Sequence, residues 1–531
     1  MTPPGFDYDW IIIGSGFGGS VSALRLSEKG YSVAVLEAGR RRADDEYAES
    51  TWDLRNFLWM PRLGLRGILE LSPFKDIFIA SGAGVGGGST VYANTLYRAK
   101  PAFFTNPQWQ GLADWATELA PHYETAERML GVATVPYPSA GQELLQEVAA
   151  EFDATGTFTR TPVGVFFGDP NREVPDPYFG GEGPARTGCT RCGACMVGCR
   201  VGAKNTLLKN YLWFAEKRGA TVIPDRRVTE ILPLGAGDGR DGYRVTTERP
   251  GAWLAKERRT FTARGVIVSA GALGTNRLLI ANKVKGTLPR LSDRLGELVR
   301  TNSESILAIS MPDDRGKPWF DVAISASIHP SDDTHVEFCT YGRKGDFMSL
   351  LLAPLTGNGT RVTRPLMLVR AILRHPWRAM RGLWPRGWSR RSLILLVMQT
   401  NDNAIAFRPK RGLFGLRLRT EQHAEKPNPT FIPVANAIAE WLERRTGGTA
   451  HSSVFEATAN IPTTAHILGG APIGRDATTG VVDARLRAFG YENLLIVDGS
   501  TMPANPGVNP SLSITALAEY AMAQVPAKAV A

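Results

Sequence analysis

The feature that most constrains the fold is the stretch from Ile11 to Glu37, IIIGSGFGGSVSALRLSEKGYSVAVLE. It contains an apolar strand, a glycine-rich turn, a helix with an apolar face and a second strand that ends at an acidic residue. The glycines Gly14, Gly16 and Gly19 have the G-x-G-x-x-G spacing, which allows a tight turn, a close approach of a pyrophosphate and close helix packing. The carboxylate of Glu37 is placed where a ribose hydroxyl would bind. These parts in this order predict a dinucleotide-binding βαβ unit.

Length and cysteine content limit the class of protein. A chain of 531 residues with 43% hydrophobic residues is large enough for two interleaved domains. No run of about 18 apolar residues predicts a transmembrane helix, and the first ten residues lack the basic and apolar regions of a signal peptide. Four of the five cysteines fall between Cys189 and Cys199, so we expect no disulfide framework and a cytoplasmic protein.

The net charge of +10 is concentrated in one segment, because nine arginines lie between Arg361 and Arg391 and no acidic residue occurs between Phe347 and Asn401. Arginine interspersed with aliphatic residues and tryptophan is typical of a segment that lies on a membrane surface. Nucleic acid and an oligomer contact are the alternatives. We predict peripheral contact of residues 361–392 with the inner face of the membrane, and no nucleic-acid binding. The tryptophans are Trp377, Trp384 and Trp388.

Two further segments extend the nucleotide-domain pattern. Residues 81–94, SGAGVGGGSTVYAN, contain five glycines, which suits a backbone that passes close to a bulky planar ligand. Residues 260–279 predict a buried strand, a glycine turn and a helix, and residues 493–497 a last buried strand before a C-terminal helix from Ser513.

The rest of the chain predicts a second, α+β domain. Strand-like runs at residues 322–328, 393–398 and 405–408 predict an antiparallel sheet. We also expect an amphipathic helix at residues 205–216 and a helical excursion within residues 51–79.

Four motifs resemble the glucose-methanol-choline (GMC) family of flavin oxidoreductases over nearly the whole chain: GSGFGG with Glu37, GAGVGGGSTVYAN, VIVSAGALGTNRLL, and LIVDGSTMPANPGVNPSLSITALAE. The sequences HILGGA from His466 and GVNP from Gly507 resemble the cholesterol oxidase branch, whose cofactor is FAD. The expected fold class is therefore α/β, a Rossmann-type FAD-binding domain interleaved with an α+β substrate domain on an antiparallel sheet. We assign the FAD-binding domain to residues 1–100, 186–300 and 455–531, and the substrate-binding domain to residues 101–185 and 301–454.

The resemblance also implies which residues contact FAD. Gly86, Gly87, Gly88 and Ser89 would lie against the flavin, in the loop that also contains Asn94. Val228 would meet the adenine. The ribityl and pyrimidine side would face Asp498, Asn509 and Pro510.

Alcohol oxidation needs a base that removes the hydroxyl proton while a hydride leaves carbon. Of the seven histidines, His466 alone precedes a Gly-Gly turn next to the last nucleotide-domain strand, and a neutral imidazole suits this role. The resemblance implies the same role, and implies that Asn509 orients the substrate oxygen or the flavin. A histidine that only caps a turn is the structural alternative.

The cholesterol oxidase branch also isomerises the enone product with a carboxylate that precedes a strand. We align that strand with residues 393–398. The preceding residues 388–392 read WSRRS, so no carboxyl group is available there and isomerase activity is not expected.

The cysteines have the spacing Cys189-x2-Cys192-x2-Cys195-x3-Cys199 of a bacterial ferredoxin run, with Arg200 where a proline would follow. A 4Fe-4S cluster, a zinc ion on four thiolates, and free or disulfide-prone cysteines all remain open. With an iron-sulfur cluster, reduced FAD could pass electrons to a redox partner protein, and the enzyme would be a dehydrogenase rather than an oxidase.

The sequence thus predicts an FAD-dependent oxidoreductase that converts a 3-hydroxy to a 3-keto group on a steroid or other bulky lipid alcohol. One alternative is a long-chain or terpenoid alcohol dehydrogenase of the same family. An alternative of another class is a non-catalytic electron carrier with flavin and an iron-sulfur cluster.

Overall fold

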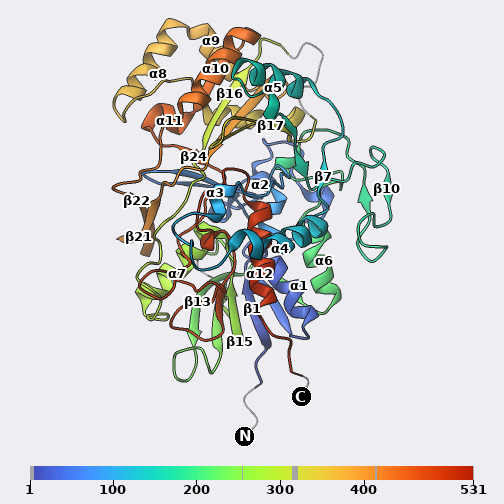
Figure 1. The fold of residues 1–531 in the computed structure, drawn as a ribbon, viewed down its shortest axis with the longest axis vertical. Helices are drawn as coiled ribbons and strands as arrows, with labels where there is room; N and C mark the ends of the chain where they lie inside the picture. Colours follow the sequence, from blue (N-terminus) through green and yellow to red (C-terminus); the bar gives the residue numbers. More distant parts are fainter. Residues whose placement is uncertain (1–4, 254, 314–320, 413–414, 530–531) are drawn as a thin grey trace.

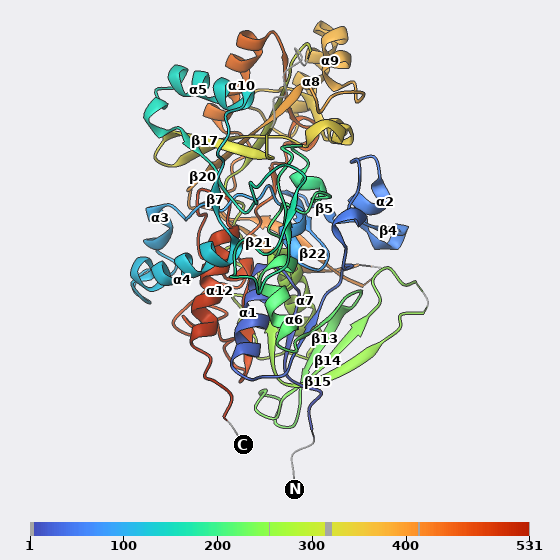
Figure 2. The same cartoon turned by 90° about the vertical axis from the view of Figure 1, so that its right-hand side faces the viewer.

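A computed structural model describes residues 5–253, 255–313, 321–412 and 415–529 of the chain. The molecule is elongated, with one large sheet near the two termini and another at the opposite end (Figure 1 and Figure 2). Within the described part of the chain, no helix is both long enough and apolar enough to cross a bilayer.

The sheet near the termini has the strand order β12-β2-β1-β15-β14-β13, and β25 pairs with β15. The pairs among β12, β2, β1, β15 and β25 are parallel, whereas β14 and β13 are added antiparallel. The helices α1 and α12 pack against each other beside this sheet. The strands are β1 (Tyr8–Ile13), β2 (Val33–Leu36), β12 (Thr221–Ile223), β13 (Arg227–Pro233), β14 (Tyr243–Glu248), β15 (Arg259–Val268) and β25 (Leu494–Ile496).

This sheet confirms the Rossmann-type prediction. The first unit runs from β1 through α1 (Phe17–Glu28) to β2, and α7 (Gly271–Lys285) and α12 (Ser511–Ala523) follow the two other glycine-containing motifs. Its central strands β1 and β2 are buried along almost their whole length, as expected of parallel strands covered on both faces.

The second large sheet is antiparallel, with the order β19-β23-β16-β20-β18-β17-β8, which confirms the predicted antiparallel sheet. The helices α5 and α10 pack on it and enclose a second apolar core. Its strands are β8 (Thr159–Arg160), β16 (Ser305–Ser310), β17 (Ile324–Ser331), β18 (Thr334–Cys339), β19 (Leu352–Pro354), β20 (Ser392–Gln399) and β23 (Thr449–Ser453), and the helices are α5 (Ala140–Glu151) and α10 (Pro433–Thr446).

Three local expectations need correction. The run at residues 405–408 belongs to β21 (Ile405–Gly412), which forms a hairpin with β22 (Gly415–Gln422) outside the large sheet. The helix expected from residue 205 is α6 (Tyr211–Lys217), and it starts late because the Asn210 side chain accepts a hydrogen bond from the Tyr211 N–H at 2.6 Å.

Residues 51–79 contain only the one-turn helix α2 (Leu54–Phe57), followed by short strands, so the helical expectation there is wrong. A 3-10 turn at Pro61–Leu63 ends at Gly64 with φ +76°, and a Cβ on Gly67 would lie 2.1 Å from the Phe57 carbonyl carbon. Composition suggested a helix, but proline and closely packed glycine prevent one.

The remaining elements are short or connect the two sheets. They are β3 (Trp59–Met60), β4 (Leu65–Arg66), β5 (Leu69–Pro73), β6 (Phe78–Gly82), α3 (Pro101–Phe104), α4 (Trp115–Leu130), β7 (Ala133–Thr134), β9 (Pro162–Val163), β10 (Glu173–Val174), β11 (Arg186–Thr187), α8 (Thr363–Arg374), α9 (Pro376–Leu383), α11 (Val454–Ala459) and β24 (Thr463–Thr464).

The basic segment forms α8 and α9, which lie at the end of the molecule opposite the termini (Figure 1 and Figure 2). Leu373 and Trp377 are 76% and 77% exposed. Trp388 is buried instead, with its indole N–H donating to the Ser310 hydroxyl at 3.1 Å, and Arg364 is buried with a hydrogen bond to the Thr430 carbonyl at 2.9 Å. Trp388 and Arg364 are therefore not part of the exposed surface of α8 and α9.

Candidate active site

Two glycine-rich segments meet at the carboxyl end of the parallel strands. A Cβ added to Gly87 would lie only 2.6 Å from the Gly16 Cα, so the turn after β1 and the loop after β6 are in close contact. The Ser15 hydroxyl joins them, because it donates to Glu37 at 2.7 Å and accepts from the Gly86 N–H at 3.0 Å. The sequence motifs are thus brought together as predicted for one nucleotide site.

The turn after β1 fits the pyrophosphate of FAD. Gly14 has φ +100°, and a Cβ there would lie 2.2 Å from the Ser269 carbonyl oxygen. A Cβ on Gly19 would lie 2.0 Å from the Gly14 oxygen, so helix α1 packs tightly on the turn. A Cβ on Gly16, in contrast, meets nothing within 4 Å. Open space remains where a pyrophosphate would approach the backbone and the amino end of α1.

Glu37 lies beside this turn and is buried. Its carboxylate accepts hydrogen bonds from the Ser15 N–H at 3.0 Å and the Gly39 N–H at 2.7 Å, while burial raises its pKa. Glu37 therefore holds the turn in shape, and its carboxylate also has the acceptor capacity that a ribose hydroxyl requires.

A cavity of about 310 Å³ extends from the glycine-rich turn to the proposed base. Six of the residues predicted from sequence line it: Gly16, Gly88, His466, Asp498, Asn509 and Pro510. Residues more than 490 positions apart in the sequence therefore share one site.

Other predicted contacts lie behind the cavity wall or elsewhere. Ser89 uses its hydroxyl to donate to the Gly86 carbonyl at 2.7 Å and to accept from the Leu207 N–H at 3.1 Å, so it holds the loop together. Val228 is buried on β13, and Asn94 lines a different cavity, which contains the cysteines. Neither of these two is among the residues that line the cavity of His466.

His466 is oriented by Glu304, which the sequence reasoning missed. The His466 Nδ1 makes a short contact with a Glu304 carboxylate oxygen, and the Ala465 N–H donates to the other oxygen at 2.7 Å. Burial lowers the pKa of His466, but the adjacent Glu304 outweighs it and the net shift is upward. A proton held on Nδ1 leaves Nε2 as the basic nitrogen. Glu304 and His466 are 162 positions apart, so no local pattern links them. The position of Glu304 directly before β16 was the available signal for its role.

Glu337, a second missed acid, lies beside Asn509. The Asn509 Nδ2 donates to Glu337 at 3.3 Å, and the Asn509 Oδ1 is buried without a hydrogen-bond partner in the described structure. Burial raises the pKa of Glu337 to about 8. Glu337 lies in the middle of β18, opposite Leu396 of β20. No carboxyl group precedes β20, whereas Glu337 reaches Asn509 from the neighbouring strand; a glutamate within an apolar strand was the available signal for it.

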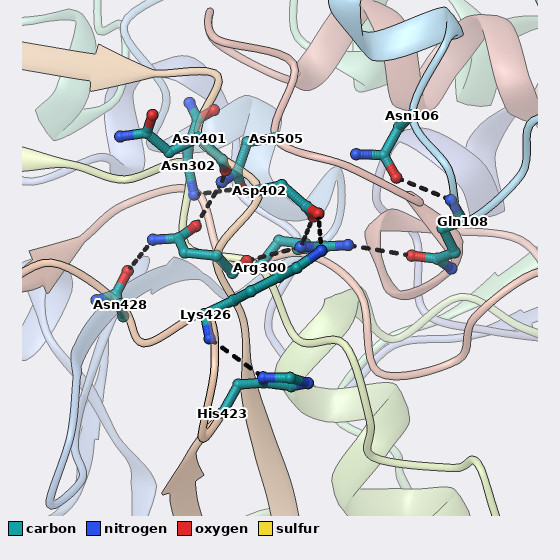
Figure 3. A network of polar contacts seen from close by, with 11 residues as sticks. Asn106, Gln108, Arg300, Asn302, Asn401, Asp402, His423, Lys426, Asn428 and Asn505 are labelled. Atoms are coloured by element: carbon teal, nitrogen blue, oxygen red, sulfur yellow. Dashed lines mark hydrogen bonds and ion pairs between the residues drawn. The ribbon is translucent and has the colours of Figure 1, made fainter.

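A polar network fixes the loop that carries Asn509 (Figure 3). The Asn302 N–H donates to the Asn505 Oδ1 at 2.8 Å. The Asn302 side chain also donates to the Val508 carbonyl at 3.0 Å. Arg300 pairs with Asp402 at 2.6 Å in the same network. Asn302 is two residues from Glu304, so one short segment contacts both the loop that carries Asn509 and the base His466.

All four cysteines of the ferredoxin-like run line a second cavity, of about 460 Å³. They are free thiols, so the disulfide alternative is not observed among them. In the described ranges of the chain, no three His, Cys, Asp or Glu side chains are grouped closely enough to hold a metal ion. This arrangement supports neither the zinc alternative nor the 4Fe-4S cluster that the cysteine spacing suggested.

Comparisons with known proteins match three segments of the chain to family models. Models described as GMC oxidoreductase match residues 185–295 and 419–518, and a model of an NAD(P)-binding Rossmann-like domain matches residues 12–43. Among solved structures, pyridoxine 4-oxidase from Mesorbium loti (TM-score 0.61, 16% identity, 97% of this chain and 98% of that one) and formate oxidase (TM-score 0.60, 13% identity, 97% of each) share the fold.

Two curated relatives are much closer in sequence. A cholesterol oxidase from Mycobacterium tuberculosis is 49% identical, with 98% of this chain and 92% of the relative covered. A cholesterol oxidase from Acinetobacter baumannii is 44% identical, with 99% and 96% covered. At this identity over almost its full length, the chain belongs to the GMC oxidoreductase family, in its cholesterol oxidase-like branch.

Proposed function

We propose that the protein oxidises a secondary hydroxyl group, 3-hydroxy to 3-keto, on a steroid or sterol-like lipid. The observation that carries the proposal is one cavity lined by the FAD-type glycine turn, by His466 with its Glu304 partner, and by Asn509. The two relatives named as cholesterol oxidases favour a sterol over other alcohols.

The residues of the cavity suggest how the reaction proceeds. FAD, when bound, supplies the acceptor for the hydride that leaves the carbinol carbon. Nε2 of His466 removes the hydroxyl proton, and the negative charge of Glu304 stabilises the imidazolium that forms. The Asn509 amide orients the substrate oxygen. Apolar side chains exclude water and suit a lipid ring system: Leu69, Leu273, Ile324, Leu396 and Ile467.

A substrate panel separates this proposal from its alternatives. We expect a 3β-hydroxysterol to be oxidised with a kcat/KM at least about tenfold above that of long-chain or terpenoid alcohols, since pocket shape discriminates on this scale. The ketone product and the reduced flavin are measured. A higher kcat/KM for a long-chain alcohol would show that this class, not sterols, is the substrate. No turnover with any alcohol would favour the non-catalytic electron carrier.

Glu337 contacts Asn509, which lines the cavity, and so favours a second step, isomerisation of the ketone. Moving a ring double bond into conjugation requires a base that takes a proton from carbon next to the carbonyl and returns it further along the ring. A buried carboxyl with a pKa of about 8 is a stronger base than an ordinary glutamate, and it lies against Asn509.

Glu337→Gln keeps the shape of the side chain but removes the base. We expect the variant to oxidise a sterol with an isolated ring double bond, yet to release the unconjugated ketone, with isomerisation slowed by about 10²-fold or more. In the unmodified protein the isomerisation rate should rise with pH through about 8, as the carboxylate forms. The ultraviolet absorbance of the conjugated enone reports both effects. Enone formation by the variant at the normal rate would remove this role from Glu337.

We also propose that α8 and α9 bind the surface of a membrane rich in anionic lipid. Exposed arginines, including Arg370 and Arg374, accompany the apolar side chains, and this combination suits phospholipid headgroups above acyl chains. We call the following residues the α8–α9 surface: Val362, Leu366, Met367, Val369, Ile372, Leu373, Trp377, Met380 and Trp384.

Replacing Leu373 with Asp and Trp377 with Ala together should abolish sedimentation with anionic vesicles, because it removes the two most exposed apolar side chains of the α8–α9 surface. The matched control is Trp253→Ala, which removes a tryptophan that is 74% exposed between β14 and β15. Equal vesicle binding by all three proteins, or none by the unmodified protein at low salt, would contradict a membrane role for this surface.

A further inference from the structure

The buried carboxyl group of Glu337 has a histidine neighbour that the oxidation and isomerisation proposed above do not use. One oxygen of this carboxyl accepts from Asn509, and the other lies 3.0 Å from Nε2 of His335. Along β18, Val336 and Phe338 pack in the apolar core of the antiparallel sheet, so His335 and Glu337 share the opposite face of the strand. The two side chains are therefore direct neighbours inside the protein.

His335 is buried with both of its ring nitrogens unsatisfied. The residue is 0% exposed, and neither Nδ1 nor Nε2 has a hydrogen-bond partner in the described structure. The contact with Glu337 is short enough for a hydrogen bond but is not aligned as one, so only the angle of the ring has to change. Buried polar atoms without partners destabilise a fold, which favours a functional reason for this histidine.

His329 continues the row from His335 toward the surface. The two ring centroids are 4.7 Å apart, and His329 is half-buried whereas His335 is fully buried. Nδ1 of His329 lies 3.2 Å from the Thr334 carbonyl, which can only accept, so Nδ1 carries the proton and Nε2 is left to accept one. The turn that follows β17, residues 331–333, is exposed. The row of Glu337, His335 and His329 therefore leads from beside Asn509 to solvent.

The environment of the two histidines keeps both rings neutral. Burial, together with a smaller effect of the Lys100 ammonium group, lowers the pKa of His335 to about 3 and that of His329 to about 4. A neutral imidazole can accept a proton on one nitrogen while it releases one from the other. The other titratable groups that act on this row, or on Lys100 beside it, are Tyr97, Glu304, Asp332, Asp333, Cys339 and His466.

Glu337 needs a way to release a proton when the cavity is filled. Because burial raises its pKa to about 8, the carboxyl group is protonated in most molecules at neutral pH, and it must lose this proton before it can act as a base. A lipid in the cavity would displace water from the side of Asn509, and Leu396 lies opposite Glu337 on β20. The histidine row offers a second side from which the proton can leave.

We propose that His335 and His329 carry protons between Glu337 and solvent while the cavity is occupied; this inference rests on the isomerisation proposed for Glu337. The carboxylic acid of Glu337 gives its proton to His335, which releases the proton of its other nitrogen to His329, and His329 gives one to water. The O–H bond of Glu337 breaks, one hydronium ion forms, and both rings end neutral. The reverse movement restores the acid.

Rapid mixing of the FAD-loaded protein with a limiting amount of unconjugated 3-ketosterol tests this route without the oxidation step. With a pKa of about 8, about one Glu337 in ten is ionised at pH 7. In the unmodified protein the enone should form in a single phase, because protons redistribute faster than the ketone isomerises. In His335→Phe about a tenth of the enone should form at this fast rate and the rest at least about tenfold more slowly. At pH 9 the slow phase should shrink to about a tenth, since most Glu337 is then ionised before mixing.

Two further variants complete the test. His329→Phe lies further from Glu337 and should give the same two phases, so the route can be tested even if His335→Phe does not fold. The matched control is His451→Phe, because His451 is also 0% exposed with both ring nitrogens unpaired in the described residues, but lies on β23. It should react in a single phase.

A single phase at pH 7 in either folded variant of the row, or two phases in His451→Phe, would overturn the proton route. A slow phase that persists unchanged at pH 9 would also overturn it, because a merely structural defect does not depend on the ionisation of Glu337. Enone formation at the normal rate by Glu337→Gln would instead contradict the isomerisation role of Glu337, and the route with it.

Discussion

His466→Asn is expected to lower kcat by about 10²- to 10⁴-fold, the usual loss on removal of a general base, while FAD content stays unchanged. Asparagine retains a hydrogen-bonding side chain next to Glu304 but cannot take a proton. Steady-state turnover of a sterol and the ratio of flavin to protein are the two measurements. Turnover within a few-fold of normal would mean that another group removes the hydroxyl proton.

The pH dependence of kcat/KM tests the role of Glu304 independently. Only the neutral imidazole can act as base, and contact with Glu304 raises the pKa of His466 above its ordinary value despite burial. Activity should therefore fall as the pH drops through a pKa above 6.5. In Glu304→Gln the acid is replaced by a neutral group, the imidazolium loses its stabilising charge, and this fall should shift to lower pH. A fall at the same pH in both proteins would remove Glu304 from this role.

Gly16→Val is expected to abolish FAD binding and all oxidation, yet leave a folded protein. The position has room for a Cβ, with no atom within 4 Å, and its φ of −71° suits any residue. A valine there would occupy the space that the pyrophosphate needs. Flavin content and the thermal unfolding of the protein without flavin are measured together.

Gly14→Val is the matched control for that prediction. At Gly14 a Cβ would collide with the Ser269 backbone at 2.2 Å, and φ is +100°. This variant should therefore lose stability even without flavin, by more than the roughly 0.5 kcal/mol expected of an unobstructed site. If Gly16→Val binds FAD normally, the pyrophosphate does not lie at this turn.

The parts of the fold that were predictable from the sequence are those encoded by contiguous residues. The unit from β1 to β2 carries its glycines, helix and acid within 27 residues, and the motifs around Gly271 and Asn509 are equally local. The cavity of His466 follows from these motifs because parallel strands bring their carboxyl ends to one edge.

Residues that act through long-range pairing were not predictable. Glu304 reaches His466 across 162 positions, and Glu337 reaches Asn509 across 172, so neither spacing is visible in a local pattern. For Trp388, the composition of the surrounding segment predicted the wrong environment. The arginines and tryptophans of that segment suggested an exposed membrane contact, but the segment turns inward before β20 and the indole is buried against Ser310.

Anaerobic reduction of the bound flavin by a 3β-hydroxysterol tests the central claim most directly. On mixing the FAD-loaded protein with excess sterol, the flavin absorbance should bleach, and one equivalent of 3-ketosterol should form for each flavin reduced. Flavin that remains oxidised in the presence of saturating sterol, or bleaching without formation of a ketone, would contradict the account.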